Sequence, residues 1–313
     1  RTRVRDPRLT TMRIAHLSDL HLMGGPIRAH RLLNKRLTGW VNLKYRRHAL
    51  HRRALVRALA AEIHRLDVDH VVVTGDLSNL SLEDEFDAVK RLLDEDLRFP
   101  ADRVSIVPGN HDVYTSGSVR KRRFAAYFGK YATSDLPELV TDHPAGAFPF
   151  VRFRGPSAII GLASAVPRPP MIAAGEIGRP QLEALGRVLE HPEVRGRLPV
   201  ILLHHPPNNP ASRQRTLTNG LWDSERLLQR LGVMDKGIVL HGHLHERVQR
   251  ALSDAQPGVR VVGATSASLE HAGDHKHAGF HVYEVDATGL VGKPTVHMLS
   301  RDTEGFEISA LPA

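Results

Sequence analysis

Residues Met12–Asp19 read M-R-I-A-H-L-S-D, a short apolar run that breaks at an acidic residue. Such a run is typical of a buried β-strand. The β-branched run His70–Thr74 (H-V-V-V-T) repeats the pattern, and so does Val104–Val107, which Pro108-Gly109 closes. Residues Leu82–Leu97 lie between them and have the apolar spacing of a helix. The first part of the chain therefore predicts strands that alternate with helices.

The remaining sequence continues this alternation and then changes to strands only. Predicted helices cover residues 28–66 with a break at Gly39, 119–131, 180–190 and 221–231. Predicted strands cover residues 148–153, 158–162, 198–203, 237–240, 248–252, 259–262, 281–285, 295–299 and 306–308. This order predicts an α/β fold whose sheets are covered by helices, with the C-terminal strands joining a second sheet. Because no Pro/Gly/Ser-rich linker divides the chain, we expect one domain over residues 12–313, after an N-terminal extension, residues 1–11, that is disordered or foreign to the fold.

Composition excludes several kinds of protein. The chain of 313 residues has no Cys, which excludes disulfides and thiolate metal ligands. No apolar run approaches the length of a membrane span, so a cytoplasmic location is expected. The net charge of +9 comes from one segment, because residues 22–61 contain ten Lys or Arg and no acidic residue. Charge runs are usually solvated faces, but residues 28–57 also predict contact with an anionic membrane surface or a lipid-linked substrate.

Polar side chains recur where the predicted strands end. They are Asp19-Leu20-His21, Gly75-Asp76, Gly109-Asn110-His111-Asp112, His204-His205 and His241-Gly242-His243-Leu244-His245. In open α/β sheets the C-terminal strand ends line the functional crevice, so these clusters should converge. These clusters contain two Asp, one Asn and at least four His. That is more donors than one tetrahedral metal site can use, and about the number that two ions need. Oxygen and imidazole donors favour Mn, Fe or Zn.

Each motif alone is also typical of a turn or a helix cap, but the ordered set is specific. It resembles the signature of the calcineurin-like metallophosphoesterase superfamily: D-x-H, G-D, G-N-H-[DE], H and G-H-x-H. The resemblance extends from Asp19 to His245. It implies a sandwich of two mixed β-sheets flanked by helices, with the active site at the C-terminal ends of the strands.

The resemblance also implies a role for each matching residue. One divalent ion would be held by Asp19, His21 and His245. The other would be held by Asn110, His204 and His243, with Asp76 bridging the two. A hydroxide between the ions would attack phosphorus in line, and His111 would protonate the leaving oxygen. Asp112 would orient an imidazole.

Some assignments stay open at this stage. His205 is the alternative to its neighbour His204, which is favoured as the first residue past its strand. Arg213 and Arg215 follow a proposed ligand and could contact substrate, although a solvated loop is the plainer interpretation. The four histidines of the segment His271–His281 could bind a third metal, although loop histidines more often bind none. His241 is interpreted as a core residue or a support for the ligands.

For the substrate, the favoured interpretation is a phosphodiester. The spacing and the H-H-P-P sequence at His204 resemble bacterial class III cyclic nucleotide phosphodiesterases and glycerophosphodiesterases. Asn79 departs from the G-D-x-x-D that many of those relatives have. The alternative is a phosphoanhydride, cleaved by a membrane-surface pyrophosphatase similar to UDP-2,3-diacylglucosamine hydrolases at the inner membrane face. A DNA nuclease is less favoured, since no aromatic-rich nucleic-acid surface is evident. An inactive scaffold would be expected to lack a ligand.

Overall fold

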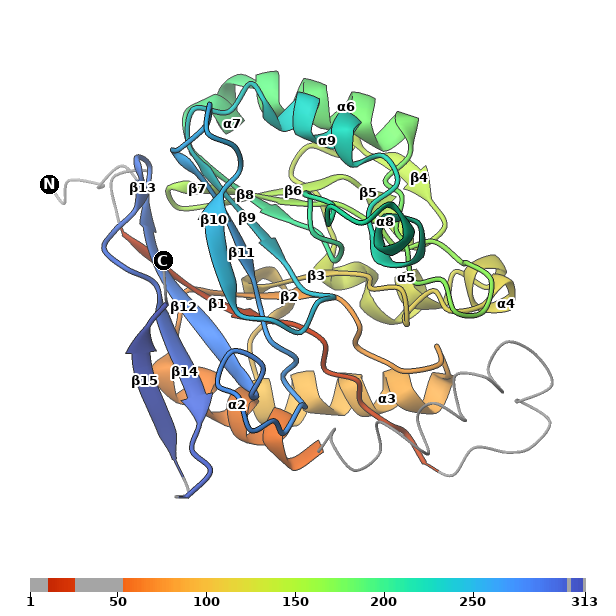
Figure 1. Ribbon diagram of the computed structural model, residues 1–313, viewed down its shortest axis with the longest axis vertical. Coiled ribbons are helices and arrows are strands. Elements are labelled where there is room, and N and C mark those ends of the chain that lie inside the picture. The colour runs from red at the N-terminus through yellow and green to blue at the C-terminus, as the bar shows by residue number, and fades with distance from the viewer. Residues whose placement is uncertain (1–10, 26–52, 303–304, 312–313) are drawn as a thin grey trace, which may run out of the picture.

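Two β-sheets lie against each other in the computed structural model, and helices cover their outer faces (Figure 1). The structure describes residues 11–25, 53–302 and 305–311. The first sheet has the order β15-β14-β12-β1-β2-β3, with β13 paired to β12, and the second has the order β10-β11-β9-β8-β7-β6. The predicted sandwich of two mixed sheets flanked by helices is therefore confirmed.

The strands of the first sheet are β1 Met12–Leu17, β2 His70–Thr74, β3 Val104–Val107, β12 Gly279–Asp286, β13 Gly289–Leu290, β14 Thr295–Leu299 and β15 Phe306–Ala310. Those of the second are β6 Phe150–Arg154, β7 Ser157–Gly161, β8 Leu198–Leu202, β9 Gly237–His241, β10 Val248–Ala251 and β11 Val259–Gly263. A small separate sheet pairs β4 Thr141–His143 with β5 Gly146–Phe148.

The α-helices are α2 Arg53–Leu66, α3 Glu83–Arg91, α4 Ser116–Arg120, α5 Arg123–Phe128, α6 Arg179–Glu190, α7 Pro192–Arg195, α8 Arg213–Asn219 and α9 Ser224–Leu231. A π-helical turn, η4 Leu92–Leu97, continues α3. Short 3₁₀ turns are η5 Ala101–Arg103, η6 Gly129–Tyr131 and η7 Pro137–Leu139.

Parallel strands at the centre of each sheet give the fold its two cores. β1, β2 and β3 run parallel, and every residue of β2 is buried, as expected for a sheet covered on both faces. In β8, Val200 and Leu202 face the core that joins both sheets. Ile201 lies between them and faces the second core, beneath α6 and α9. The alternating side chains of one strand thus bind the sandwich together on one face and its helical cover on the other.

The C-terminal strands do not all belong to the second sheet, as the sequence had predicted they would. β10 and β11 do join the second sheet, but β12, β14 and β15 return to the first. β12 pairs antiparallel with β1 from Met12↔Val285 to His16↔His281. The prediction was wrong because both sheets offer buried apolar strands as partners, and local sequence does not distinguish between them.

Two predicted helices and one predicted loop also differ. The helix expected over residues 119–131 is interrupted near Arg122, which has φ 45° and therefore a left-handed backbone. The helix over 82–97 changes to the wider π-helical turn at Leu92. The segment expected as a loop before Asn219 contains α8, whose first turn Ser212 caps by accepting a hydrogen bond from the Arg215 backbone N–H.

Most of the basic segment 28–57 lies outside the described residues, and so do residues 1–10 of the expected extension. Only residues 53–57 of that segment are described, at the start of α2. Arg57 pairs there with Asp96, Nε to Oδ2 3.0 Å. None of the helices in the described ranges combines the length and the apolar character needed to cross a bilayer. Contact with a membrane surface stays a prediction.

Candidate metal centre

The seven proposed ligands lie at the C-terminal ends of five parallel strands. Asp19, Asp76 and Asn110 follow β1, β2 and β3 of the first sheet, whereas His204 and His243 follow β8 and β9 of the second. Backbone hydrogen bonds hold these loops together, including Asp19 N–H to Gly75 C=O at 3.0 Å. The expected convergence of the strand ends is therefore what the structure has.

One group of donors consists of Asp19, His21 and His245. His245 Nε2 lies 3.0 Å from Asp19 Oδ1, and His21 Nε2 lies 3.2 Å from His245 Nε2. The ligating atoms of all three residues lie within 4.8 Å of one another. This group has the size of a single cation site.

A second group adjoins the first through Asp76. Asp76 Oδ2 lies 3.4 Å from His204 Nε2 and 3.9 Å from His21 Nε2, so it is adjacent to a residue of each group. Asn110 Oδ1 lies 3.1 Å from His204 Nε2 and 3.2 Å from His243 Nδ1. Asp76 therefore occupies the place that a bridging carboxylate requires.

The outer ring nitrogens of two histidines are held by backbone carbonyls. The Nδ1 of His204 is 2.8 Å from Thr74 C=O, and the Nε2 of His243 is 2.9 Å from Asn219 C=O. A carbonyl can only accept, so each of these nitrogens carries a proton and the other ring nitrogen faces the centre. The carbonyl of Asn219 comes from the end of α8, which gives that helix a part in the site.

His205 points elsewhere. Its Nδ1 hydrogen-bonds with Ser164 Oγ at 2.8 Å, and its Nε2 donates to Ala173 C=O at 2.8 Å. Burial and the neighbouring His243 hold the pKa of His205 well below its usual value, so the ring is neutral. Of the two adjacent histidines, His204 is the one that the structure directs to Asp76.

The turns after the strands use an uncommon backbone conformation. Of the ten non-glycine residues with positive φ in the described part of the chain, five are proposed ligands: Asp19, His21, Asp76, His243 and His245. Left-handed backbone costs about 1–3 kcal/mol at a non-glycine residue and gathers at functional sites. Here it turns successive side chains of D-x-H and H-x-H toward the same point.

Two glycines are required by the crowding around the ligands. Gly75 has φ +88°, and a Cβ there would meet the backbone of Gly109 and lie 2.8 Å from His204 Nδ1. A Cβ on Gly242 would collide with Ser18 Oγ and Asp19 Oδ2. The glycine that precedes Asp76 and the one that precedes His243 thus leave room for the ligands of the neighbouring strands.

The charges of the centre support one another. Burial opposes ionisation of Asp76, but the imidazoles of His204 and His111 hold the pKa of this carboxyl well below its usual value. Burial alone would lower the pKa of His204, yet the Asp76 and Asp19 carboxylates raise it to about 9. Two ionised carboxylates in a buried site therefore attract positive charge strongly.

His111 lies beside the two groups and contacts four neighbours. Its Nδ1 donates to Asn79 C=O at 2.6 Å, and its backbone N–H donates to Asp76 Oδ1 at 2.8 Å. Its ring stacks on Tyr114, with centroids 5.5 Å apart and planes 7° from parallel, and meets His21 edge-on at 5.2 Å. His111 is therefore held in a fixed orientation next to the proposed ligands.

Asp112 has a different role from the one expected. It does not orient an imidazole; it accepts hydrogen bonds from the backbone N–H groups of Gly109, Ser78 and Leu77 at 2.9, 2.9 and 3.2 Å. Burial, with Asp76 nearby, raises the pKa of Asp112 to about 7. The side chain thus ties the loop after β3 to the loop after β2, which carry Asn110 and Asp76.

A buried chain of hydrogen bonds behind Asp19 was missed by the motif analysis. Ser18 Oγ donates to Asp19 Oδ2 at 2.6 Å, and Thr74 Oγ1 donates to Ser18 Oγ at 2.9 Å. His16 Nε2 contacts Thr74 Oγ1 at 2.8 Å, and His16 Nδ1 contacts Tyr283 Oη at 3.2 Å. The signal was present, because polar residues within an otherwise apolar strand must find partners when they are buried.

Other predicted residues lie outside this arrangement. Arg213 and Arg215 are exposed on α8, and neither side chain makes an ion pair within the described residues. In the histidine-rich segment, His271 Nδ1 accepts from Gly273 N–H and His277 Nδ1 accepts from His271 N–H. These two ring nitrogens bond within the loop, whereas His281 lies in β12 and its Nδ1 contacts Tyr283 Oη at 3.1 Å. No third group of ligating atoms forms among the described residues. His241 is buried, as expected.

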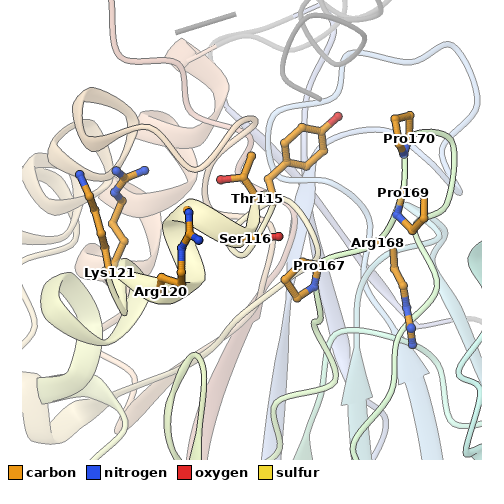
Figure 2. A pocket seen from close by; sticks show the side chains of 11 residues that line it. Thr115, Ser116, Arg120, Lys121, Pro167, Arg168, Pro169 and Pro170 are labelled. Carbon is orange, nitrogen blue, oxygen red and sulfur yellow. The ribbon is translucent and has the colours of Figure 1, made fainter. Parts of the chain in front are cut away.

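A cavity of about 700 Å³ opens next to the centre (Figure 2). It is lined by Tyr114, Thr115, Ser116, Gly117, Arg120, Lys121, Arg123, Pro167, Arg168, Pro169 and Pro170. Tyr114, whose ring stacks on His111, joins the cavity to the proposed ligands. None of these eleven residues was singled out from the sequence.

This fold, with two adjoining groups of Asp, His and Asn at the strand ends, defines a dimetal phosphoesterase. A family model described as calcineurin-like phosphoesterase matches residues 12–247, and the chain belongs to that family. The family is dimetal-dependent and hydrolyses phosphoesters, as the sequence predicted.

Solved structures agree on the fold. A dimetal phosphatase from Danio rerio is similar at a TM-score of 0.59 and 14% identity, over 96% of this chain and 98% of that chain. A purple acid phosphatase from yellow lupin (Lupinus luteus) is similar at 0.59 and 12%, over 96% of this chain and 53% of that chain. No curated protein matches the sequence.

Proposed function

We propose that this chain is a phosphodiesterase that works with two divalent cations. The observation that carries the proposal is the convergence of seven donor residues from both sheets on two adjoining positions. Asp19, His21 and His245 would hold one cation, and Asn110, His204 and His243 the other, with Asp76 between them. An inactive scaffold would not need to keep every donor.

An observation that does not depend on the sequence motif also indicates that these residues fit a pair of cations. Asp19 Oδ1 is buried and forms no well-aligned hydrogen bond; it faces His245 Nε2 at 3.0 Å, which is another proposed donor to the same cation. The other oxygen of Asp19 accepts from Ser18 Oγ and His243 N–H. A buried carboxylate oxygen in these surroundings is costly unless a positive charge completes it, and a cation held by Asp19 and His245 would do so. The oxygen and imidazole donors suit Mn, Fe or Zn.

When bound, such ions polarise phosphoryl oxygens and lower the pKa of the attacking water. The chain itself would supply the proton for the leaving oxygen. The Nδ1 proton of His111 is committed to Asn79 C=O, so the transferable proton is the one on Nε2. Stacking on Tyr114 keeps the ring in that orientation during the transfer.

A diester rather than a monoester is favoured by the space beside His111. A diester carries two substituents on phosphorus, and the cavity of about 700 Å³ has room for the second one. The resemblance of the H-H-P-P sequence at His204 to that of class III phosphodiesterases supports the same substrate class.

The proposal is tested by comparing bis(p-nitrophenyl) phosphate with p-nitrophenyl phosphate on protein reconstituted with Mn²⁺. We expect about two bound ions per chain and faster hydrolysis of the diester. Asp76→Asn removes the charge shared by the two positions, so we expect loss of at least one ion and a fall in activity of about 100-fold or more.

The matched control is Asp142→Asn, which changes an exposed carboxylate that pairs with Arg122. It should keep both ions and the full activity. Full metal content and activity in Asp76→Asn would overturn the ligand assignment. Preference for the monoester would overturn the assignment as a diesterase and leave the metal centre intact.

A further inference from the structure

The cavity beside His111 has two walls that come from distant parts of the chain. One wall is the turn and helix from Thr115 to Lys121, and the other is the proline-rich segment Pro167–Pro170 (Figure 2). Three of the four residues in the second wall are proline, whose fixed φ restricts the backbone. The cavity is therefore bounded on one side by a stiff wall.

The charges of the lining residues are not balanced. Arg123 pairs with Glu83, and Arg168 pairs with Glu176, with 2.9 Å between Nη2 and Oε2, so two of the four cations are compensated. Arg120 and Lys121 are exposed and make no ion pair with any described residue. Among the residues that the structure describes, no acidic side chain lines the cavity. Its net charge is positive, and the last residue of α4 and the residue after it supply that charge.

Arg168 makes contacts that leave its guanidinium unsuited to bind an anion in the cavity. Its guanidinium lies 3.4 Å from the ring centroid of Trp222, and its Nε donates to Ala174 C=O at 3.2 Å. These contacts fix the proline-rich wall against Ala174 and against Trp222, which shortly precedes α9. Arg120 and Lys121 are thus the two cations that can reorient toward a ligand, with the exposed hydroxyl of Ser116 on the same wall.

The position of the cavity relates it to the reaction. Tyr114 lines the cavity and stacks on His111, which in turn meets His21 at 5.2 Å. A phosphodiester bound at the centre would therefore direct one of its ester groups past Tyr114 toward Arg120 and Lys121. Two cations and a hydroxyl match the dianionic charge and acceptor oxygens of a phosphate monoester.

We propose that this cavity binds a second phosphate, so that the preferred substrate is a phosphodiester with a phosphate monoester on one of its ester groups. The inference rests on the proposed function for the identity of the reacting group. It adds a subsite formed by Arg120 and Lys121 that selects among diesters.

The kinetic test uses two chromogenic diesters that differ by one phosphate. They are thymidine 5′-(p-nitrophenyl phosphate) and its 3′-phosphorylated derivative, assayed with Mn²⁺ at low ionic strength. We expect the 3′-phosphorylated substrate to have a KM at least about tenfold lower, as for one charge-assisted hydrogen bond. In Arg120→Gln/Lys121→Gln the ratio of the two KM values should approach one.

The matched control removes two arginines from a different cavity. Arg226→Gln/Arg230→Gln changes the cavity between α6 and α9, which contains none of the proposed ligands. This variant loses the same total charge, but at a position away from the proposed subsite. It should therefore keep the wild-type ratio of the two KM values. A ratio that falls equally in both variants would show a general electrostatic effect and overturn the subsite.

A binding measurement separates the two proposals. Isothermal titration with Mn²⁺ compares thymidine 3′,5′-bisphosphate with thymidine 5′-monophosphate, and the bisphosphate should bind at least about tenfold more tightly. Equal affinities, or a preference that survives in Arg120→Gln/Lys121→Gln, would overturn the subsite even when both diesters are hydrolysed. If neither diester is hydrolysed, the proposed function fails, and the titration still decides whether the second phosphate is recognised.

Discussion

His111 illustrates how single residues are arranged in this site. The Asn79 carbonyl accepts a hydrogen bond from its Nδ1–H, the Tyr114 ring covers one face, and its own backbone N–H donates to Asp76. The loop that carries His111 also supplies Asn110, a proposed ligand. A change at His111 should therefore separate proton transfer from metal binding, provided that the loop keeps its shape.

We predict that His111→Ala lowers kcat by about 10²–10⁴, the usual contribution of a general acid, while metal content stays close to wild type. The loss should be small for p-nitrophenyl esters and large for alkyl esters, because a poor leaving group needs the proton more. Steady-state kinetics with metal analysis on the same samples measures both.

His271→Ala is the control, since the ring of that histidine hydrogen-bonds only within its own loop among the described residues, and its contact with Arg301 is made by the backbone carbonyl, which the substitution keeps. Loss of metal in proportion to activity in His111→Ala would make His111 a ligand. An equal loss for both kinds of ester would remove its role as the acid.

At the scale of elements, Arg152 joins the edge of the second sheet to the first. Its guanidinium, on β6, is buried and donates to the carbonyls of Ala101 and Lys130, each at 3.0 Å, and to Thr133 Oγ1 at 2.6 Å. A further contact reaches the Val104 carbonyl of β3. Burial lowers the pKa of Arg152 to about 10, so the side chain stays charged.

We predict that Arg152→Leu lowers the free energy of unfolding by about 3 kcal/mol or more. The substitution leaves the buried carbonyl of Val104 and the part-buried carbonyls of Ala101 and Lys130 without this donor, and an unsatisfied buried group costs about 1–3 kcal/mol. Urea denaturation followed by circular dichroism measures the change. Arg179→Leu, at an exposed position in α6, should stay within about 0.5 kcal/mol. Equal stabilities of the two variants would contradict this account of Arg152.

For the whole molecule, buried histidines make stability depend on pH. Burial lowers the pKa of His16 to about 3 and that of His143 and His241 to about 4. These rings belong to three different strands in three sheets. Glu85 and Asp112 have the opposite effect on the pH dependence of stability, because burial raises the pKa of each carboxyl to about 7.

The sign of the effect follows from proton binding. Between about pH 6.5 and pH 4 the unfolded chain protonates these histidines and the folded chain does not, so stability falls as the pH drops through that window. Each histidine contributes up to about 1.4 kcal/mol per pH unit. We predict that the free energy of unfolding of His143→Asn declines less steeply between pH 6 and pH 4.5 than that of the wild type. The difference in slope should correspond to about one proton fewer taken up on unfolding. Urea denaturation at several pH values measures this slope. An unchanged slope would show that His143 titrates alike in both states.

Much of the metal centre could be predicted from the sequence for a local reason. An apolar run in the sequence indicates a buried strand, and the first polar residues after it mark the end of that strand. The C-terminal ends of parallel strands meet at one edge of a sheet. Asp19, Asp76 and Asn110 follow directly from this reasoning. His243 and His245 add the spacing of H-x-H after another strand.

Only the tertiary structure decided the features that depend on partners distant in sequence. Local pattern cannot assign β12 to β1 rather than to the second sheet, because both sheets offer buried apolar edges. It cannot separate His204 from His205, whose rings are directed by Thr74 on one side and by Ser164 and Ala173 on the other. The cavity beside Tyr114 is formed by segments about fifty residues apart, which carry no shared motif and meet only because the two sheets pack together.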